Sequence, residues 1–160
     1  MIKNVIFDLD GTLALCPKEL WDGVPPIDFA ELGKRCDEYL VNEPIARLFR
    51  FYRDSPGHRV WILSGRSGSV DTERKTINWL TYHKLLPKSR TKYPGPEDFA
   101  QFHMRQHGDK RSDVEVKREM IQTLGLTPEN TEIVFDDRNC MVNAWRLWGF
   151  QCCQVAEGGF

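Results

Sequence analysis

The segment Val5-Ile6-Phe7-Asp8-Leu9-Asp10-Gly11-Thr12 is an apolar run that ends in two acids, a glycine and a threonine. Runs that are apolar at consecutive positions are typical of strands covered on both faces, as in parallel sheets. We therefore predict a first strand over residues 5–7. Three further runs of the same character predict strands at Val60–Leu63, Ile133–Phe135 and Phe150–Val155.

Between these runs, apolar residues recur at the three- and four-residue spacing of amphipathic helices. The pattern predicts helices over Pro44–Tyr52, Asp71–His83, Val114–Leu124 and Asn139–Trp148. The last two are followed by Gly125 and Gly149, residues that commonly end helices. Strands that alternate with helices indicate a doubly wound, Rossmann-like α/β fold with a mostly parallel sheet.

The chain has 160 residues, a length that favours a single domain. Two stretches, residues 16–42 and 87–112, are interrupted by prolines and glycines and lack a clear period. We predict that both are small irregular inserts in one domain spanning residues 1–160. Neither is large enough to indicate a separate cap domain.

The formal net charge is −1, so there is no overall basic field of the kind that attracts nucleic acid. No stretch approaches the ~18 consecutive apolar residues of a membrane span, and the N-terminal run resembles a strand rather than a signal peptide. The cysteine count is odd, five, and no two cysteines form a C-x-x-C pair. This composition predicts a reduced, cytoplasmic protein without a membrane partner.

Polar residues follow three of the predicted strands: Asp8 and Asp10, then Ser64, then Asp136-Asp137. Ligands of open α/β sheets bind beyond the carboxyl ends of the strands, so we expect these side chains to meet at one edge. Neighbouring carboxylates repel each other unless a cation joins them, and Mg²⁺ suits an all-oxygen site.

In such a site, Asp8 could attack phosphorus as a nucleophile and Asp10 could act as general acid and base. The plain structural alternatives are that Asp8 and Asp10 are solvated turn residues, and that Asp136-Asp137 caps the N-terminus of the next helix.

The segment Asp8-Leu9-Asp10-Gly11-Thr12 resembles the first motif of the haloacid dehalogenase (HAD) phosphatases, in which the first Asp is the nucleophile and the second the acid/base. Ser64 resembles the second motif, a hydroxyl that binds the phosphoryl group. Lys117 matches the third, a cation that neutralises charge, and Asp136-Asp137 matches the fourth, which completes the metal site. The resemblance implies Mg²⁺ held by Asp8, the Asp10 backbone carbonyl and one of Asp136 and Asp137. Taken singly, Ser64 could be a turn serine and Lys117 a solvated helix lysine.

A closer resemblance covers nearly the whole chain. The segments Ser64-Gly65-Arg66, His103-Met104-Arg105, Asp113-Val114-Glu115-Val116-Lys117 and Phe135-Asp136-Asp137-Arg138 are similar to the 3'-phosphatase domain of bacteriophage polynucleotide kinase-phosphatases. By this resemblance Arg66 and Asp113 join the catalytic set, and Arg66 is expected to hold the phosphoryl oxygens together with Ser64 and Lys117. Thr12, Gly65, Arg105 and Asp113 are expected to bind substrate. Asp113 lies one helical turn before Lys117, so the two could form an ion pair.

The chain departs from that family at two points. It has no G-x-x-x-x-G-K-[ST] loop to cradle the phosphates of a kinase substrate, so we expect a stand-alone phosphatase or one with a separate kinase or ligase partner. The family also carries an arginine shortly after the first motif, where this chain offers only Lys18. A lysine cannot form the bidentate contact of an arginine.

The leading hypothesis for substrate is a 3'-phosphorylated DNA or RNA end, or a 3'-nucleotide. Arg66, Arg105, Lys110, Arg111 and Lys117 could form a basic rim for a phosphate backbone, unless the interleaved acids make this an ordinary solvated loop. Trp21, Tyr93 and Phe102 could stack on bases, although packing is the commoner role of aromatic residues, as we expect for Trp145 and Trp148.

Two alternatives stay open. The first is a HAD phosphatase for a small substrate such as a nucleoside 5'-monophosphate. The second is a non-catalytic module that recognises nucleic-acid ends, whose expected sign, a lost nucleophile or metal acid, is not found here. The choice between DNA and RNA and the oligomeric state do not follow from the sequence.

Overall fold

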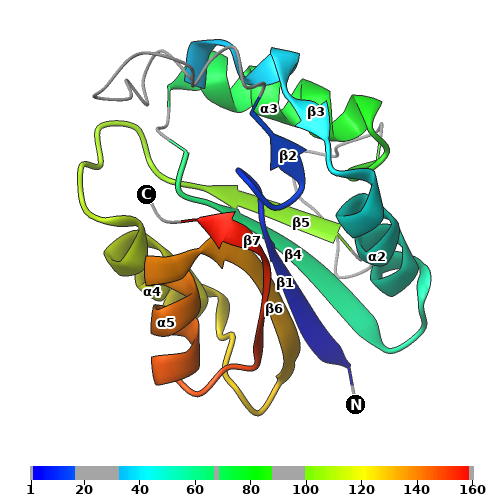
Figure 1. Cartoon of the computed structure of the whole chain (residues 1–160), viewed down its shortest axis with the longest axis vertical. Helices are drawn as coiled ribbons and strands as arrows, with labels where there is room; N and C mark the ends of the chain where they lie inside the picture. The colour runs from blue at the N-terminus through cyan, green and yellow to red at the C-terminus, as the bar shows by residue number, and fades with distance from the viewer. Residues whose placement is uncertain (1, 17–32, 67–68, 88–99, 159–160) are drawn as a thin grey trace.

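The computed structural model describes residues 2–16, 33–66, 69–87 and 100–158. Its centre is a five-stranded sheet in the order β5-β4-β1-β6-β7, in which every neighbouring pair is parallel (Figure 1). The strands are β1 (Lys3–Asp8), β4 (His58–Ser64), β5 (Ala100–Met104), β6 (Thr131–Arg138) and β7 (Cys152–Gly158). The predicted doubly wound α/β fold is confirmed.

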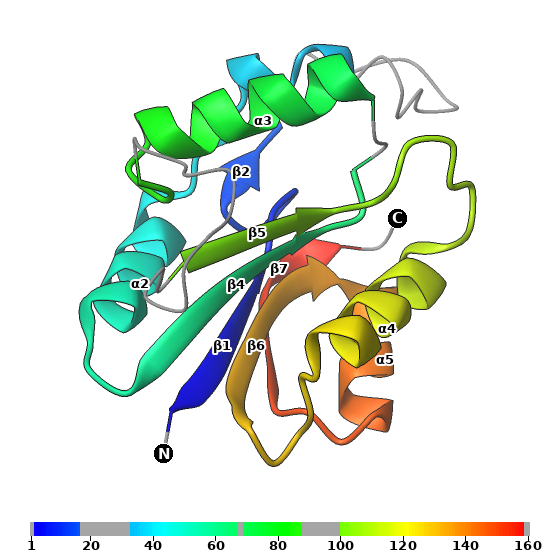
Figure 2. The same ribbon diagram turned by 180° about the vertical axis from the view of Figure 1, so that it is seen from behind.

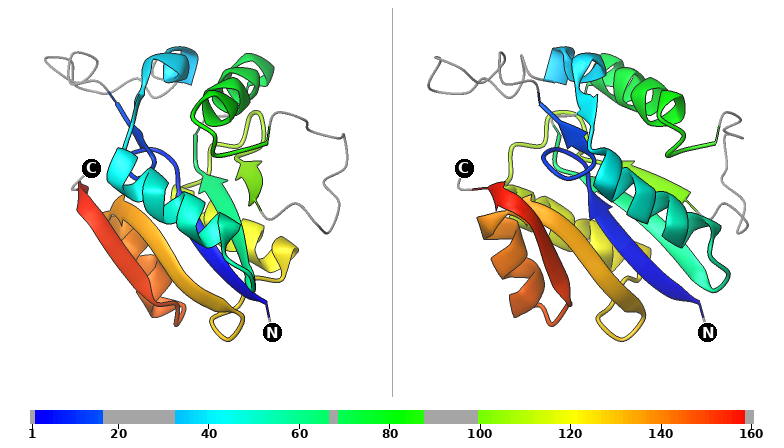
Figure 3. Two further views of the ribbon diagram at one scale, coloured as in Figure 1. Left: turned by 90° about the vertical axis from the view of Figure 1, so that its right-hand side faces the viewer. Right: turned by 45° about the vertical axis from the view of Figure 1, so that its right-hand side comes forward.

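Helices cover both faces of the sheet. On one face, α2 (Glu43–Asp54) packs on the strands near Phe7 and Ile62, and α3 (Val70–Tyr82) adds Trp79 and Leu80 to the same core from beyond the strand ends. On the other face, α4 (Asp113–Leu124) and α5 (Asn139–Leu147) pack with Ile6 and Leu63 (Figure 3). Because successive strand residues point to opposite faces, an uninterrupted apolar run serves both cores at once.

A small layer lies beyond the carboxyl ends of the strands. It consists of the antiparallel pair β2 (Ala14–Leu15) and β3 (Leu40–Val41), the short 3-10 helix η2 (Cys36–Glu38) and helix α3 (Figures 1 and 2). Trp79 of α3 donates its indole N–H to the Tyr39 carbonyl at 2.7 Å, which joins two parts of this layer.

Helix starts and stops follow local side-chain chemistry. Helix α4 begins at a capping box, in which Ser112 and Glu115 satisfy each other's free backbone N–H groups. It ends at Gly125, whose φ of 65° lies in the left-handed region that favours glycine. The predicted helices are confirmed, with boundaries that differ by one or two residues.

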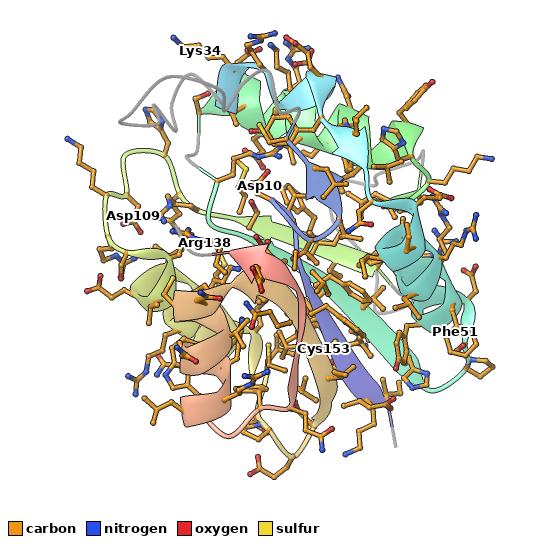
Figure 4. The ribbon with its side chains drawn as sticks, viewed as in Figure 1. Asp10, Lys34, Phe51, Asp109, Arg138 and Cys153 are labelled. Atoms are coloured by element: carbon orange, nitrogen blue, oxygen red, sulfur yellow. The ribbon has the colours of Figure 1, made fainter. Side chains whose placement is uncertain are left out.

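Two predictions about strands need correction. The sequence pattern does not predict strand β5, because its residues 100–104 read Ala-Gln-Phe-His-Met, which is too polar to resemble a buried strand. Strand β7 begins at Cys152, later than predicted, and is an edge strand rather than a buried one. Its Cys153, labelled in Figure 4, is exposed.

Several predictions fall on residues that the structure does not describe. These are Lys18 as a substitute for the family arginine, Trp21 and Tyr93 as stacking residues, and most of the insert at 16–42. Among the described residues, no helix is both long and apolar enough to cross a membrane.

The order of the strands places the site. The chain moves from β1 outward through β4 to β5, then returns to the other side of β1 for β6 and β7. This reversal beside β1 is the point at which open α/β sheets bind ligands. Asp8 at the end of β1, Ser64 at the end of β4, and Asp136 and Asp137 in β6 all lie there.

Aromatic packing around Phe7 anchors the first core. Its ring stacks on Phe135 at a centroid distance of 4.7 Å and meets the edge of Phe49 at 5.1 Å. Phe49 is fully buried on α2, whereas Phe51 on the same helix is 65% exposed.

We expect Phe49→Ala to lower the free energy of unfolding by about 3–5 kcal/mol, because it removes a large buried ring and leaves a cavity. Phe51→Ala is the matched control, with an expected change within about 0.5 kcal/mol. Urea denaturation measures both, and equal losses would contradict the packing described here.

Candidate active site

The predicted nucleophile, Asp8, shares a buried ammonium group with Asp136. Lys117 Nζ of α4 donates to Asp8 Oδ1 at 2.5 Å and to Asp136 Oδ2 at 2.9 Å. All three side chains are almost wholly buried. The second oxygen of Asp8, Oδ2, is buried and has no hydrogen-bond partner among the described residues. A buried carboxylate oxygen without a partner is costly, so this atom is the natural place for a ligand cation or a reacting group.

The cluster holds three carboxyl groups and one ammonium group, and burial together with this imbalance shifts their pKa values. Burial raises the pKa of Asp8 well above its usual value, and Lys117 opposes this only in part. Burial also raises the pKa of Asp137, to about 6, with a further contribution from Asp136. Burial alone would lower the pKa of Lys117, but the carboxylates of Asp136 and Asp8 outweigh it and raise that pKa. The lysine therefore stays charged and faces more than one carboxylate.

Asp8, Asp136 and Asp137 could hold a metal ion. One oxygen of each lies within 4.8 Å of the others, and all three residues are buried. Mg²⁺ prefers oxygen ligands of this kind. The unpartnered Asp8 Oδ2 adds to the fit, because a cation would satisfy it.

The two acids in β6 have different surroundings. Asp136 is fully engaged, since Oδ2 accepts from Lys117 and from the Trp145 indole at 3.0 Å, and Oδ1 accepts from the Arg138 backbone N–H at 3.2 Å. Asp137 accepts only a long contact from Thr12 Oγ1, 3.4 Å to Oδ1, among the described side chains. The N-cap alternative for this pair is wrong, because both lie in β6 and the N-cap of α5 is Arg138.

Gly11 allows the first turn to approach Asp137. A Cβ at Gly11 would lie 2.1 Å from Asp137 Oδ2, and the glycine has a φ of 88°, which side chains rarely adopt. The turn after β1 therefore reaches the acids of β6 only because this residue has no side chain.

Asp10 lies beyond the end of β1 and is bound by Arg66. The Arg66 Nε donates to Asp10 Oδ2 at 3.0 Å, and its Nη2 donates to Oδ1, so the contact is bidentate. Asp10 is visible near the strand ends in Figure 4. The Ser64 hydroxyl, buried at the end of β4, accepts the backbone N–H of Arg66 at 3.1 Å.

The predicted pairing of Asp113 with Lys117 is wrong. Asp113 instead accepts from two arginines, Arg105 through Oδ1 and Arg138 through Oδ2. Arg105 also donates its Nε to the Gly65 carbonyl at 2.7 Å. The reason is direction: Lys117 points inward to the ends of β1 and β6, whereas Asp113, at the first turn of α4, faces the loop after β4.

Gly65 has a role like that of Gly11. A Cβ at Gly65 would lie 2.4 Å from Asp113 Oδ1. The loop after β4 can therefore pack against the Asp113 carboxylate only with glycine at this position. Gly65, Arg105 and Asp113 thus lie in contact with one another, and their binding of substrate stays a prediction.

The predicted basic rim is only partly present. Arg66, Arg105 and Lys117 are buried and paired with acids, so they do not form an open basic surface. Lys110 and Arg111 are exposed, and Arg111 is paired with Asp109 and Glu119. Phe102 is half-buried against the core, which favours packing over base stacking.

Arg138 and Trp145 complete the site and were not predicted to belong to it. Arg138 lies in one of the segments that carry the family resemblance, whereas Trp145 is expected from the sequence to be a core residue. It is in the core, and its indole N–H also reaches Asp136. A buried Trp needs an acceptor for its indole N–H, and this requirement is the feature of the sequence that could indicate a polar partner for Trp145.

We expect Lys117→Met to lower the free energy of unfolding by about 3–5 kcal/mol in the absence of metal, because it leaves buried carboxylates without their cation. Lys110→Met changes an exposed lysine and should stay within about 0.5 kcal/mol. Urea denaturation in EDTA measures both. A Lys117→Met protein as stable as the parent would contradict the shared-ammonium arrangement.

Comparison with known proteins agrees with this geometry. The family model described as the polynucleotide kinase PNKP phosphatase domain matches residues 2–160. Two chains of a Pnkp1/Rnl/Hen1 complex, one described as an RNA repair complex, are each 29% identical, with TM-scores of 0.75 and 0.72. The match covers 99% of this chain but only 44% and 48% of those chains, so this chain spans less than half their length.

More distant structures share the fold. A HAD family enzyme from Bacteroides thetaiotaomicron, in complex with magnesium and inorganic phosphate, is 16% identical with a TM-score of 0.55, and the match covers 100% of this chain and 96% of that one. A haloacid dehalogenase-like hydrolase from Streptococcus pneumoniae is 14% identical with a TM-score of 0.57, covering 96% and 84%. The chain belongs to the family of polynucleotide kinase (PNKP) phosphatase domains, within the HAD phosphatases.

Proposed function

We propose that this protein is a Mg²⁺-dependent phosphomonoesterase that removes 3'-phosphate from nucleic-acid ends or 3'-nucleotides through an aspartyl-phosphate. The observation that carries the proposal is the buried Asp8 carboxylate, with one oxygen on Lys117 and the other without a partner among the described residues. A carboxylate held this way, next to further acids, suits nucleophilic attack on a phosphoryl group once cations balance its charge.

The reaction has two halves. In the first, an oxygen of Asp8 bonds to phosphorus while the bond to the leaving ester oxygen breaks, and Asp10 gives that oxygen its proton. In the second, Asp10 takes a proton from water as the water oxygen bonds to phosphorus. The bond between phosphorus and Asp8 then breaks, which releases phosphate and restores both acids.

Asp8, Asp137 and the Asp10 backbone carbonyl would hold the Mg²⁺, which supplies positive charge against the phosphoryl oxygens. Asp137 is the better ligand in β6, because its oxygens carry only one long contact from a described side chain. Asp136 has the different task of holding Lys117 in place.

Ser64 and Lys117 would bind the phosphoryl oxygens. The Ser64 oxygen already accepts the Arg66 N–H, so its own hydrogen can be donated to a phosphoryl oxygen. The Lys117 ammonium has three donors, and two of them are on Asp8 and Asp136. Thr12 and Gly65 lie beside this position and would shape the space for substrate.

The choice of a 3'-phosphorylated end rests on the family and on the RNA repair complex of the similar chains. The similar chains belong to Pnkp1/Rnl/Hen1 complexes, and on that likeness we propose that this domain works together with a kinase or ligase partner. The five cysteines carry no disulfide, which supports the proposed cytoplasmic location.

A phosphatase for a small substrate remains the second candidate. The observation in its favour is that Arg66 and Arg105 are buried, Arg138 is partly buried, and all three are paired with acids, so among the described residues these arginines offer little free positive charge to a nucleic-acid backbone.

The first experiment compares one short oligonucleotide carrying phosphate at its 3' end or its 5' end. We expect phosphate release only from the 3' form, only with Mg²⁺ and not with EDTA. Asp8→Asn should lower the rate by at least ~10³-fold while leaving the unfolding transition in place. Release from neither oligonucleotide, with activity on generic esters, would favour the small-substrate candidate. Parental activity in Asp8→Asn would rule out the nucleophile.

Measurements of Mg²⁺ binding can show which of Asp136 and Asp137 is the metal ligand. We expect Asp137→Asn to weaken Mg²⁺ binding by at least ~10-fold in calorimetric titration, because it removes a charged ligand. Asp109→Asn, which changes an acid on the loop after β5, should bind Mg²⁺ like the parent. Unchanged affinity in Asp137→Asn would assign the ligand role to Asp136 instead.

A further inference from the structure

Arg66 is buried and each of its three side-chain nitrogens has a partner. Nε and Nη2 are on Asp10, and Nη1 donates to Thr76 Oγ1 of α3 at 2.8 Å. The guanidinium also lies over the Tyr39 ring, 5.1 Å from its centroid. The resemblance placed Arg66 on the phosphoryl group, but its donors are directed to the general acid and to the small layer.

The two partners of this ion pair differ in how much of each side chain is exposed. The Arg66 side chain is 4% exposed, whereas that of Asp10 is 39% exposed. The acid is therefore partly accessible to solvent, whereas the arginine that holds it is buried. A bidentate guanidinium fixes both oxygens and hence the plane of the carboxylate, which a single donor cannot do.

The small layer in turn fixes Arg66. Thr76 Oγ1 accepts from Arg66 and donates to the Thr72 carbonyl at 2.7 Å, so its direction is set by α3. Tyr39 is tied to α3 through its carbonyl, which accepts the Trp79 indole N–H. The plane of the Asp10 carboxylate is thus set by α3 and by the segment after η2, elements outside the central sheet.

We propose that Arg66 is a positioning residue, which aims the Asp10 carboxyl group at the leaving oxygen and does not bind the phosphoryl group. This inference rests on the acid/base role proposed for Asp10. In the first half-reaction the proton moves from Asp10 to the ester oxygen as the bond between phosphorus and oxygen breaks. A misdirected Asp10 impairs that transfer and leaves the phosphoryl contacts of Ser64 and Lys117 intact.

The leaving group of the substrate distinguishes two possible roles of Arg66, which are to position Asp10 or to bind the phosphoryl group. An alkyl ester needs a proton on its leaving oxygen, whereas an electron-poor aryl ester expels a stable phenolate without one. Loss of general acid catalysis therefore slows the alkyl ester far more than the aryl ester. Loss of a phosphoryl contact slows both equally and weakens binding of inorganic phosphate.

The experiment measures kcat/KM of Asp10→Asn, Arg66→Lys and Thr76→Val on two substrates. These are an electron-poor aryl phosphate and an alkyl monophosphate that the parent hydrolyses. We expect Asp10→Asn and Arg66→Lys to lose at least ~10-fold more rate on the alkyl ester, and Thr76→Val to show a smaller loss of the same kind. The inhibition constant of inorganic phosphate should change less than about twofold in Arg66→Lys and Thr76→Val.

Arg50→Lys is the control, because Arg50 pairs with Glu43 and the His83 carbonyl away from the site. It should match the parent on both esters. Equal losses on both esters in Arg66→Lys, with weaker phosphate inhibition, would overturn the positioning role. Thr76→Val provides a second test if Arg66→Lys does not fold. An equal loss of rate on both esters in Thr76→Val would also overturn the positioning role of Arg66. If Asp10→Asn loses the same rate on both esters, Asp10 is not the general acid. The acid/base role proposed above and this inference would then both be wrong.

Discussion

Charge balance at the ammonium of Lys117 is the constraint on which the rest of the site depends. Asp8, Asp136 and Asp137 are buried within a few ångströms of one another, and a single lysine lies between two of them. Buried carboxylates without a cation would cost several kcal/mol each, so the strand ends could not meet without it. One positive charge does not balance three negative ones, which leaves the site suited to a divalent cation.

Close packing around the carboxylates is the second requirement. Gly11 and Gly65 leave room for the Asp137 and Asp113 carboxylates, each of which would lie within 3 Å of an added Cβ. The acids are therefore set against the backbone of neighbouring loops rather than in a wide cavity. Such contact restricts side-chain rotamers, and a restricted carboxylate loses less entropy when it binds a ligand.

The arginines of the site stabilise its acids. Arg66 binds Asp10, while Arg105 and Arg138 share Asp113, and of these five side chains Arg66 and Arg105 are buried. The charges of these arginines are neutralised by acids within the described part of the protein. The edge of the sheet can therefore hold several acids although the net charge of the chain is only −1.

The sequence by itself determined four of the five strands of the sheet and the candidate nucleophile, because strand and helix periods are local and strands end where polar residues begin. It therefore placed Asp8, Ser64 and Asp136 at one edge, and the family resemblance added Lys117. Only the tertiary structure decided that β5 joins the sheet, that β7 is an exposed edge, and that Asp113 pairs with arginines instead of Lys117. The physical reason is that ion-pair partners and edge positions depend on how elements far apart in the chain meet, which no local pattern encodes.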